Sequence, residues 1–261
     1  MHIAVIKKLG KLILGKKIIW VDIGTHFGQE YSSIFGTSLG FYSRLIKRFV
    51  GGVLLKRGKF VSPTGLKRIL KARREMRSKR NNLHSIFVEA NSKIITRKKV
   101  YRDADDVFSI ALTDNVSDPA SVTKLYLGTD SALSQGSSIF SHNNAIDRDK
   151  YISTMGIQCN LFFEGLKISI DEMFNDYQVL LRLNCEGVED TVIYSAYQTF
   201  GNRLAMISGS LNDVKRVKGD AAAEELNRFI DEKDLKFVFF SPLIYSWPEA
   251  HEAIRELMQG A

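Results

Sequence analysis

The sequence contains little cysteine and no long uninterrupted apolar run. Two cysteines, Cys159 and Cys185, in 261 residues argue against a disulfide framework and favour buried thiols in a reducing compartment. There is no CxxC pair and no cluster of histidine and cysteine with zinc spacing. No apolar stretch reaches the roughly 18 residues that a membrane-spanning helix needs. These absences argue against a disulfide-stabilised secreted domain, a zinc module and a membrane span.

The first residues also lack the pattern of a secretory signal. Lysines interrupt the apolar residues before residue 17, and no A-x-A cleavage site follows. Ile3, Ile6, Leu9 and Ile13 have helical spacing, which predicts a short amphipathic helix. We therefore expect a cytoplasmic protein, peripheral at a membrane under one of the interpretations of its charge given next.

Positive charge is abundant and concentrated in one block. The chain carries a net charge of +8, and the segment from Ser38 to Asn82 contains 14 lysines and arginines but one acid, Glu75. This block is therefore +13, which leaves −5 for the rest of the chain. Three interpretations are open: a surface for an anionic membrane, a nucleic-acid interface, or a solvated helical pair packed on the domain.

Apolar runs alternate with helical patterns, which predicts an α/β fold with a mostly parallel sheet and helices on both faces. We expect a single domain, residues 1–261, with a basic helical insertion at about 38–82. Predicted core strands are 17–22, 85–89, 107–112, 179–185, 204–208 and 236–240. Predicted helices are 24–35, 64–80, 91–100, 188–200, 220–232 and 248–259. A hairpin is expected within 113–148, and a further strand at 158–170.

The first predicted strand ends in a glycine-rich motif, D-x-G-x-x-x-G. Glycines let the backbone turn tightly and approach a ligand, and the following helix offers free N–H groups. In open α/β sheets the ligand binds at the carboxyl ends of the strands near the switch point. Glycine turns after strands also occur without a ligand. The motif predicts a nucleotide-type cofactor contacted by Asp22, Gly24, Thr25, His26 and Gly28.

An acid ends the second predicted strand, and Glu89 and the following Ala90 are both expected to contact the cofactor. A carboxylate at this point can accept hydrogen bonds from both ribose hydroxyls of a cofactor. The usual spacing from the glycine turn is about 20 residues, and the basic insertion accounts for the excess here. An ordinary surface glutamate is the alternative. No G-x-G-x-x-G run and no G-x-x-x-x-G-K-[ST] motif is present, which argues against NAD or FAD dehydrogenases and P-loop proteins.

Four later segments occur in the order of known family motifs. Residues 110–114 (IALTD) are similar to A-[VL]-S-D, and residues 135–139 (QGSSI) to G-x-S-S-L. Residues 168–172 (ISIDE) are similar to V-x-L-D-D, and residues 181–189 (LRLNCEGVE) to L-K-I-D-V-E-G-x-E. Together with the two earlier motifs, the chain resembles the FkbM family of S-adenosylmethionine-dependent O-methyltransferases over roughly residues 18 to 210.

This resemblance implies a Rossmann-like class I methyltransferase fold, S-adenosylmethionine as cofactor, and methyl transfer to a hydroxyl of a sugar, glycan or related small molecule. It adds Asp114 and Asn184 to the expected cofactor contacts. Two positions depart from the family pattern: Arg182 replaces a lysine and Asn184 replaces an aspartate. Because asparagine is not a general base, a catalytically silent module that binds S-adenosylmethionine is one alternative function.

Catalysis by methyl transfer mainly requires positioning of the two reactants and a base for the acceptor hydroxyl. Glu186 is the preferred base, with Asn184 and His26 as further catalytic candidates. Ser138, His142 and Glu189 are expected to contact the substrate. Glu189 could instead be an acid stabilised at a helix start, and His142 a solvated loop residue. No constellation calls for a metal, and the basic block keeps an RNA or DNA methyltransferase open as a second alternative.

Overall fold

The protein is described by a computed structural model that covers residues 16–43, 45–46, 61–114, 117–128, 137–144, 146–241 and 244–260. The helix predicted around residues 3–13 lies outside these residues, as do residue 44 and residues 47–60 of the basic block. Among the helices of the described part, none combines the length and apolar character needed to span a bilayer.

A six-stranded sheet forms the centre of the fold. Its strands stand in the order β3-β2-β1-β7-β8-β9, and every neighbouring pair is parallel. The order reverses between β1 and β7, as in a doubly wound, Rossmann-like sheet, so the predicted fold class is confirmed. The strands are β1 (Lys17–Ile23), β2 (Leu83–Val88), β3 (Asp106–Phe108), β7 (Tyr177–Leu183), β8 (Leu204–Gly209) and β9 (Phe237–Phe239).

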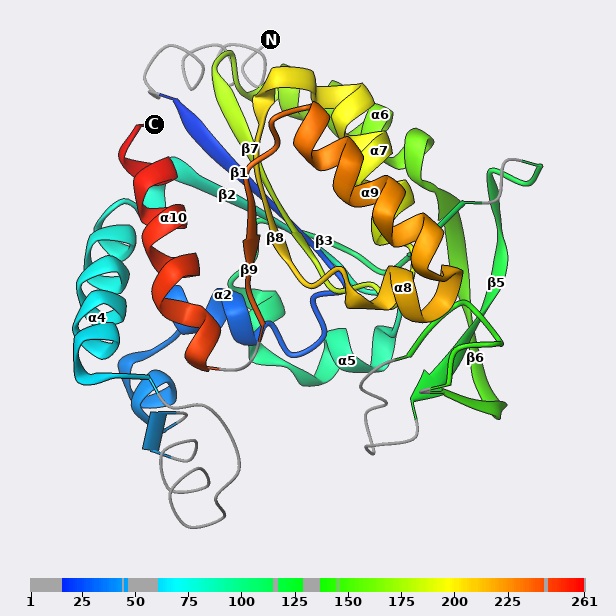
Figure 1. The fold of residues 1–261 in the computed structure, drawn as a ribbon, viewed down its shortest axis with the longest axis horizontal. Helices are drawn as coiled ribbons and strands as arrows, with labels where there is room; N and C mark the ends of the chain where they lie inside the picture. The colour runs from blue at the N-terminus through cyan, green and yellow to red at the C-terminus, as the bar shows by residue number, and fades with distance from the viewer. Residues whose placement is uncertain are drawn as a thin grey trace, which may run out of the picture.

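Helices cover both faces of this sheet (Figure 1). The described helices are α2 (Gln29–Ile34), α4 (Pro63–Ser78), α5 (Ser92–Arg97), α6 (Cys159–Met173), α7 (Glu189–Phe200), α8 (Asn212–Lys218), α9 (Asp220–Glu232) and α10 (Trp247–Gln259). Short 3-10 turns occur at Arg80–Asn82, Lys99–Arg102, Gly201–Arg203 and Ile244–Ser246.

The predictions for α7, α9 and α10 are confirmed within a residue or so. The helix predicted from residue 24 is wrong at its start, because α2 begins only at Gln29, and α8 was not predicted.

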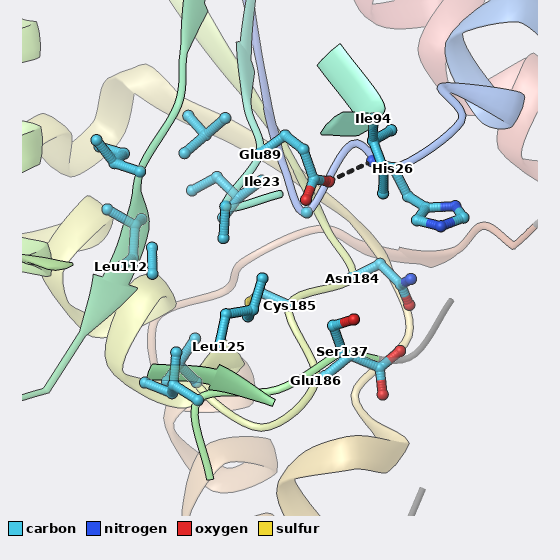
Figure 2. Close-up of a pocket in the computed structure, with 17 residues that line it drawn as sticks. Ile23, His26, Glu89, Ile94, Leu112, Leu125, Ser137, Asn184, Cys185 and Glu186 are labelled. Atoms are coloured by element: carbon cyan, nitrogen blue, oxygen red, sulfur yellow. Dashed lines mark hydrogen bonds between the residues drawn. The ribbon is translucent and has the colours of Figure 1, made fainter. Parts of the chain in front are cut away.

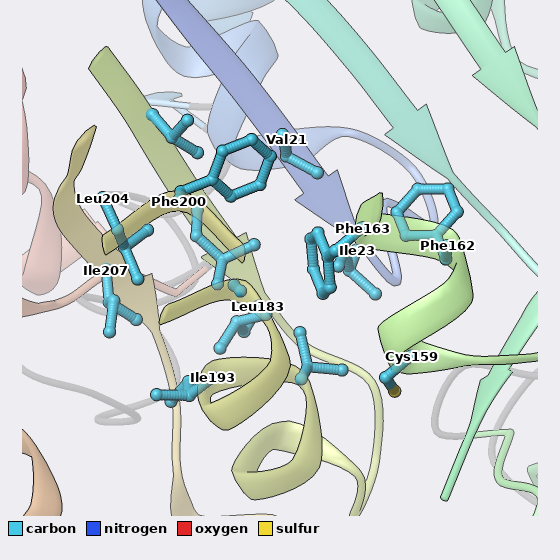
Figure 3. Packing of buried hydrophobic residues seen from close by; sticks show 14 of the residues in the cluster. Val21, Ile23, Cys159, Phe162, Phe163, Leu183, Ile193, Phe200, Leu204 and Ile207 are labelled. Atoms are coloured by element: carbon cyan, nitrogen blue, oxygen red, sulfur yellow. The ribbon is translucent and has the colours of Figure 1, made fainter. Parts of the chain in front are cut away.

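Alternation along β1 divides the core into two clusters. Ile19 and Val21 pack with α6 and α7 on one face, whereas Ile18 and Trp20 pack with α4 and α10 on the other. Figure 3 shows the first of these clusters. A strand buried on both faces needs apolar residues at nearly every position, which explains the unbroken apolar run of β1.

A second, three-stranded sheet lies beside the first. It contains β4 (Ala111–Thr113), β5 (Ala120–Gly128) and β6 (Ile146–Gln158), in the order β4-β6-β5. β5 and β6 pair in antiparallel fashion, so the antiparallel pairing is confirmed, but the bounds 113–148 are wrong because β6 begins only at Ile146 and continues to Gln158. The single strand predicted at 107–112 is wrong, because the chain leaves edge strand β3 and enters the second sheet as β4.

The strand predicted at 158–170 is also wrong, because these residues belong to helix α6. Phe162, Phe163, Leu166 and Ile170 recur at helical spacing and are buried against the sheet. The period of the buried residues, and not the overall apolar content of the segment, decides its structure.

The described end of the basic block is the predicted helix, here α4. Ser62 caps it by accepting a hydrogen bond from the Gly65 amide, and Pro63 occupies its first turn. Arg73 is buried and donates to the backbone carbonyls of Ser33 and Ile34 at the end of α2. Part of the positive charge of the block therefore stabilises the fold and does not face solvent.

Candidate functional site

A pocket lies at the carboxyl ends of β1, β2 and β7, where the strand order reverses (Figure 2). The second sheet contributes one wall through β4 and β5. The lining residues are Ile23, Gly24, His26, Val88, Glu89, Ala90, Ile94, Ile110, Ala111, Leu112, Leu125, Ser137, Ile139, Asn184, Cys185, Glu186 and Val188. Six of the predicted site residues are among them: Gly24, His26, Glu89, Ala90, Asn184 and Glu186.

Gly24 brings two strand ends together at this pocket. Its φ is +70°, and a Cβ added there would lie 2.0 Å from the Asn184 carbonyl oxygen. The backbone N–H of Asn184 in turn donates to the Ile23 carbonyl at 3.0 Å. Only glycine allows this close approach, so the loops after β1 and β7 meet and form the pocket floor.

Glu89 presents a fixed carboxylate to the pocket. Its Oε2 accepts a hydrogen bond from the His26 amide and its Oε1 accepts one from the Asn91 amide, both at 2.8 Å. Burial raises the pKa of Glu89, and the two amide hydrogen bonds oppose that shift. Each oxygen of an ionised carboxylate has two lone pairs, so each keeps capacity for one further donor. Glu89 can therefore bind two adjacent hydroxyl groups without moving.

Asp22 is a correction to the predicted cofactor contacts. Its side chain is completely buried and accepts a hydrogen bond from Arg182 Nη1 at 3.0 Å. Arg182 also donates to Glu30 at 2.5 Å and to the Gly24 carbonyl at 3.0 Å. Burial opposes the charge of Arg182, but Glu30 and Asp22 outweigh it, and the pKa of Arg182 lies above its ordinary value. Asp22 positions the glycine loop from beneath and has no surface facing a ligand.

Thr25 and Gly28 also lie outside the pocket lining. Thr25 is buried and donates to the Asp22 carbonyl at 2.8 Å, which closes the turn of the loop. Gly28 has a φ of +54°, and a Cβ there would lie 2.7 Å from the Val100 side chain. Both residues shape the loop, and the direct cofactor contact that the motif predicts for them stays a prediction.

Glu186 and Asn184 face Glu89 from the opposite side of the pocket (Figure 2). Glu186 adopts a left-handed conformation with φ +58°, and its carboxylate pairs with Arg216 of α8. Burial and the nearby Asp213 raise the pKa of Glu186, and Arg216 opposes the shift. A carboxylate with a raised pKa is a better proton acceptor near neutral pH than an exposed glutamate.

Glu189 is a further correction, because its side chain is completely buried. It accepts hydrogen bonds from the Cys185 amide at 3.0 Å and the Gly187 amide at 2.8 Å. Burial raises its pKa to about 7, more than the amide hydrogen bonds lower it. Glu189 therefore fixes the loop that carries Glu186 and does not reach a substrate, contrary to the prediction.

Three other predicted residues are not in the lining. Ser138 is buried and donates to the Glu186 carbonyl at 2.8 Å, so it positions that loop. The ring of His142 is hydrogen-bonded to the Val217 carbonyl at 3.0 Å. Asp114 lies 3.6 Å from the Lys218 ammonium, beyond the end of β4. Direct contact of these three residues with a substrate or cofactor stays a prediction.

The apolar wall of the pocket was not among the predicted site residues. Ile94, Ile110, Leu112, Leu125 and Ile139 come from α5, from β4 and β5, and from the segments beside them. Ser137, the neighbour of the predicted Ser138, lines the pocket instead. The alternation of β5 was a usable signal, since Leu125 is buried between two more exposed neighbours.

The ionisable residues that line the pocket include two acids. Glu89 and Glu186 contribute two carboxylates, whereas the described residues that line the pocket include no lysine and no arginine. Across the described part of the chain, no group of three or more histidine, cysteine, aspartate or glutamate residues could hold a metal ion. The pocket therefore favours a ligand with hydroxyl groups, an apolar part and positive charge over a phosphate-rich ligand.

The structure defines a Rossmann-like α/β protein with a pocket at the switch point of its sheet. No protein-family model matches the chain, and no curated protein or solved structure matches it significantly.

Proposed function

We propose that the protein is an S-adenosylmethionine-dependent O-methyltransferase that acts on a hydroxyl group of a glycan or related small molecule. One observation carries the proposal. The Glu89 carboxylate is held by two backbone amides in a switch-point pocket that has a second carboxylate and no cation among its described lining residues. The resemblance of the sequence motifs to the FkbM family supports the same conclusion.

The pocket residues suit this cofactor in three respects. Glu89 can accept hydrogen bonds from both ribose hydroxyls. Ile94, Leu112 and Leu125 offer an apolar wall for an adenine ring. The Glu89 carboxylate favours a positively charged ligand group, and Glu186 adds less because Arg216 pairs with it. The phosphates of a nicotinamide or flavin dinucleotide would find no lysine or arginine among the described lining residues.

When bound, S-adenosylmethionine would supply an electrophilic methyl group, to which the acceptor oxygen bonds as the sulfur–methyl bond breaks and S-adenosylhomocysteine is left. Glu186 would accept the proton that the acceptor hydroxyl loses, since its carboxylate lies in the pocket and has a raised pKa. The Asn184 amide can donate to or accept from the same hydroxyl, and it orients the acceptor without taking its proton. Positioning by these two residues and burial of the reacting groups account for catalysis here.

Calorimetric titration with S-adenosylhomocysteine tests the proposal. We expect micromolar binding to the unmodified protein and at least about tenfold weaker binding to Glu89→Ala, because charge-assisted hydrogen bonds to the ribose are lost. Glu164→Ala, which removes an exposed glutamate of α6, should bind normally. Ala90→Phe should block the pocket while leaving the Glu89 hydrogen bonds intact. Normal binding to both pocket variants would show that the cofactor site lies elsewhere.

A further inference from the structure

Three large apolar side chains are exposed on the helical segment that begins at residue 38. Its described residues are 38–43, 45 and 46, and in Figure 1 it lies below α4. Phe41 and Leu45 pack into the core, whereas Leu39 is 82% exposed, Tyr42 49% and Ile46 62%. Leu39, Tyr42 and Ile46, spaced three and four residues apart, lie on one helix face. We call them the apolar stripe.

Cations lie beside the apolar stripe. Arg77 of α4 reaches the start of the segment, with its Nη1 3.4 Å from Ser38 Oγ. On another side, a surface groove is lined by Thr37 and Gly40 of the segment, by Lys98 and Lys99, which follow α5, and by one acid, Asp103. The Lys98 ammonium lies 3.8 Å from the centre of the Phe27 ring in the same groove. The stripe is therefore an apolar surface with positive charge around it.

This combination is typical of a surface that enters the headgroup region of an anionic bilayer. Aliphatic side chains insert into the boundary of the acyl chains, tyrosine prefers the interface, and lysine and arginine pair with anionic headgroups. A surface for single-stranded nucleic acid would instead stack bases on aromatic rings, which Leu39 and Ile46 cannot provide. We propose that the apolar stripe, with Arg77, Lys98 and Lys99, binds the surface of an anionic lipid membrane.

Ile94 of α5 lines the pocket, and the chain reaches Lys98 one helical turn later. The α5 segment therefore connects one wall of the pocket with the cations of the groove. Membrane binding does not depend on the proposed methyl transfer, and either can fail without the other.

Sedimentation with lipid vesicles tests the stripe. The full chain is mixed with vesicles of phosphatidylcholine alone or of phosphatidylcholine and phosphatidylglycerol at about 7:3, a typical anionic composition. We expect binding only to the anionic vesicles, and at least tenfold weaker binding for Ile46→Asp, since an inserted aliphatic side chain is lost. The matched control is Ile168→Asp on α6, a residue 64% exposed, which should bind as the unmodified protein does.

The charge is tested separately. Lys99→Glu should weaken vesicle binding at least about fivefold, because each cation near an anionic surface contributes about that factor. Lys150→Glu on β6, also an exposed lysine, should leave vesicle binding unchanged. Equal weakening by Ile46→Asp and Ile168→Asp, equal binding to neutral vesicles, or binding of a 20-nucleotide oligonucleotide without binding of vesicles would each overturn the proposal.

Discussion

At the residue scale, the carboxylate of Glu186 is subject to two opposing influences. Burial and Asp213 raise its pKa, while the ion pair with Arg216 lowers it. We predict that Arg216→Gln moves the pKa of Glu186 further upward, because the opposing charge is removed. The acid limb of any Glu186-dependent activity should move to higher pH with it. Carbon-13 NMR of the glutamate side chains, titrated with pH, measures this directly.

Arg203→Gln is the control for that titration. Arg203 forms an ion pair with Asp171 at 3.0 Å, and Asp171 does not line the pocket. Its loss should leave the Glu186 titration where it is. An unchanged Glu186 midpoint in Arg216→Gln would mean that the ion pair does not form in solution.

Two acids at strand ends show what could be predicted from the sequence at this scale. Asp22 and Glu89 each end or follow an apolar run before a turn, and the same reasoning assigned both to the cofactor. The structure separates them because Arg182 stands opposite Asp22 in the register of β1 and β7. Strand neighbours 160 residues apart in the chain were not available from the sequence, so this ion pair could not be predicted.

At the element scale, Arg182 joins β7 to β1 and α2. We predict that Arg182→Met lowers the free energy of unfolding by about 3–5 kcal/mol, because it leaves Asp22 and Glu30 buried without a counter-charge. Lysine in Arg182→Lys restores the positive charge but cannot bind both acids and the Gly24 carbonyl. The free energy of unfolding of this variant should lie between those of the unmodified protein and Arg182→Met. Urea denaturation gives the values.

A partly exposed pair provides the comparison for Arg182. Arg203→Met breaks an ion pair whose side chains are 43% and 38% exposed, and it should cost less than about 1 kcal/mol. Similar losses for the two substitutions would contradict a buried structural role for Arg182.

The loop between β7 and α7 depends on Glu189. Its pKa of about 7 lies above the ordinary value of about 4.3 expected in the unfolded chain. Between these values the folded state holds a proton that the unfolded state releases, so the free energy of unfolding should decrease as pH rises from about 4 to about 7. Glu189→Gln removes this titration and one amide acceptor. We predict a loss of about 1–3 kcal/mol at pH 6 and a weaker pH dependence over that range, measured by denaturation at several pH values.

Glu164→Gln, at an exposed position on α6, should keep both the stability and the pH dependence of the unmodified protein. A Glu189→Gln protein with the same pH dependence as the unmodified chain would show that Glu189 is already ionised throughout this range.

Elements with a clear period could be predicted, and elements defined by a change of sheet could not. The strands of the main sheet and helices α7, α9 and α10 follow from apolar runs and helical spacing. Residues 107–112 form one apolar run in the sequence, yet they supply β3 to the main sheet and β4 to the second. Only the pairing partners distinguish the two strands, and no local pattern marks the break.

At the scale of the whole molecule, cations that are contiguous in the sequence lie in different environments in the structure. The block from residue 38 to 82 is a single basic segment in the sequence. In the structure Arg73 is buried against α2, Arg68 pairs with Glu252, and Arg80 pairs with Asp105 at 3.2 Å. The proposed membrane surface therefore includes Lys98 and Lys99, which lie outside the block, together with Arg77 from within it. Counting charges along the chain could not separate these groups.

The pocket has the opposite character, with two carboxylates and no cation among its described lining residues. The most direct test of the account is a paired calorimetric titration of the unmodified protein with S-adenosylmethionine and with NAD⁺. We predict micromolar binding of S-adenosylmethionine, at about −8 kcal/mol, and no detectable binding of the phosphate-rich dinucleotide. Tighter binding of NAD⁺, or binding of neither ligand, would contradict the assignment of this pocket to a methyl-donor cofactor.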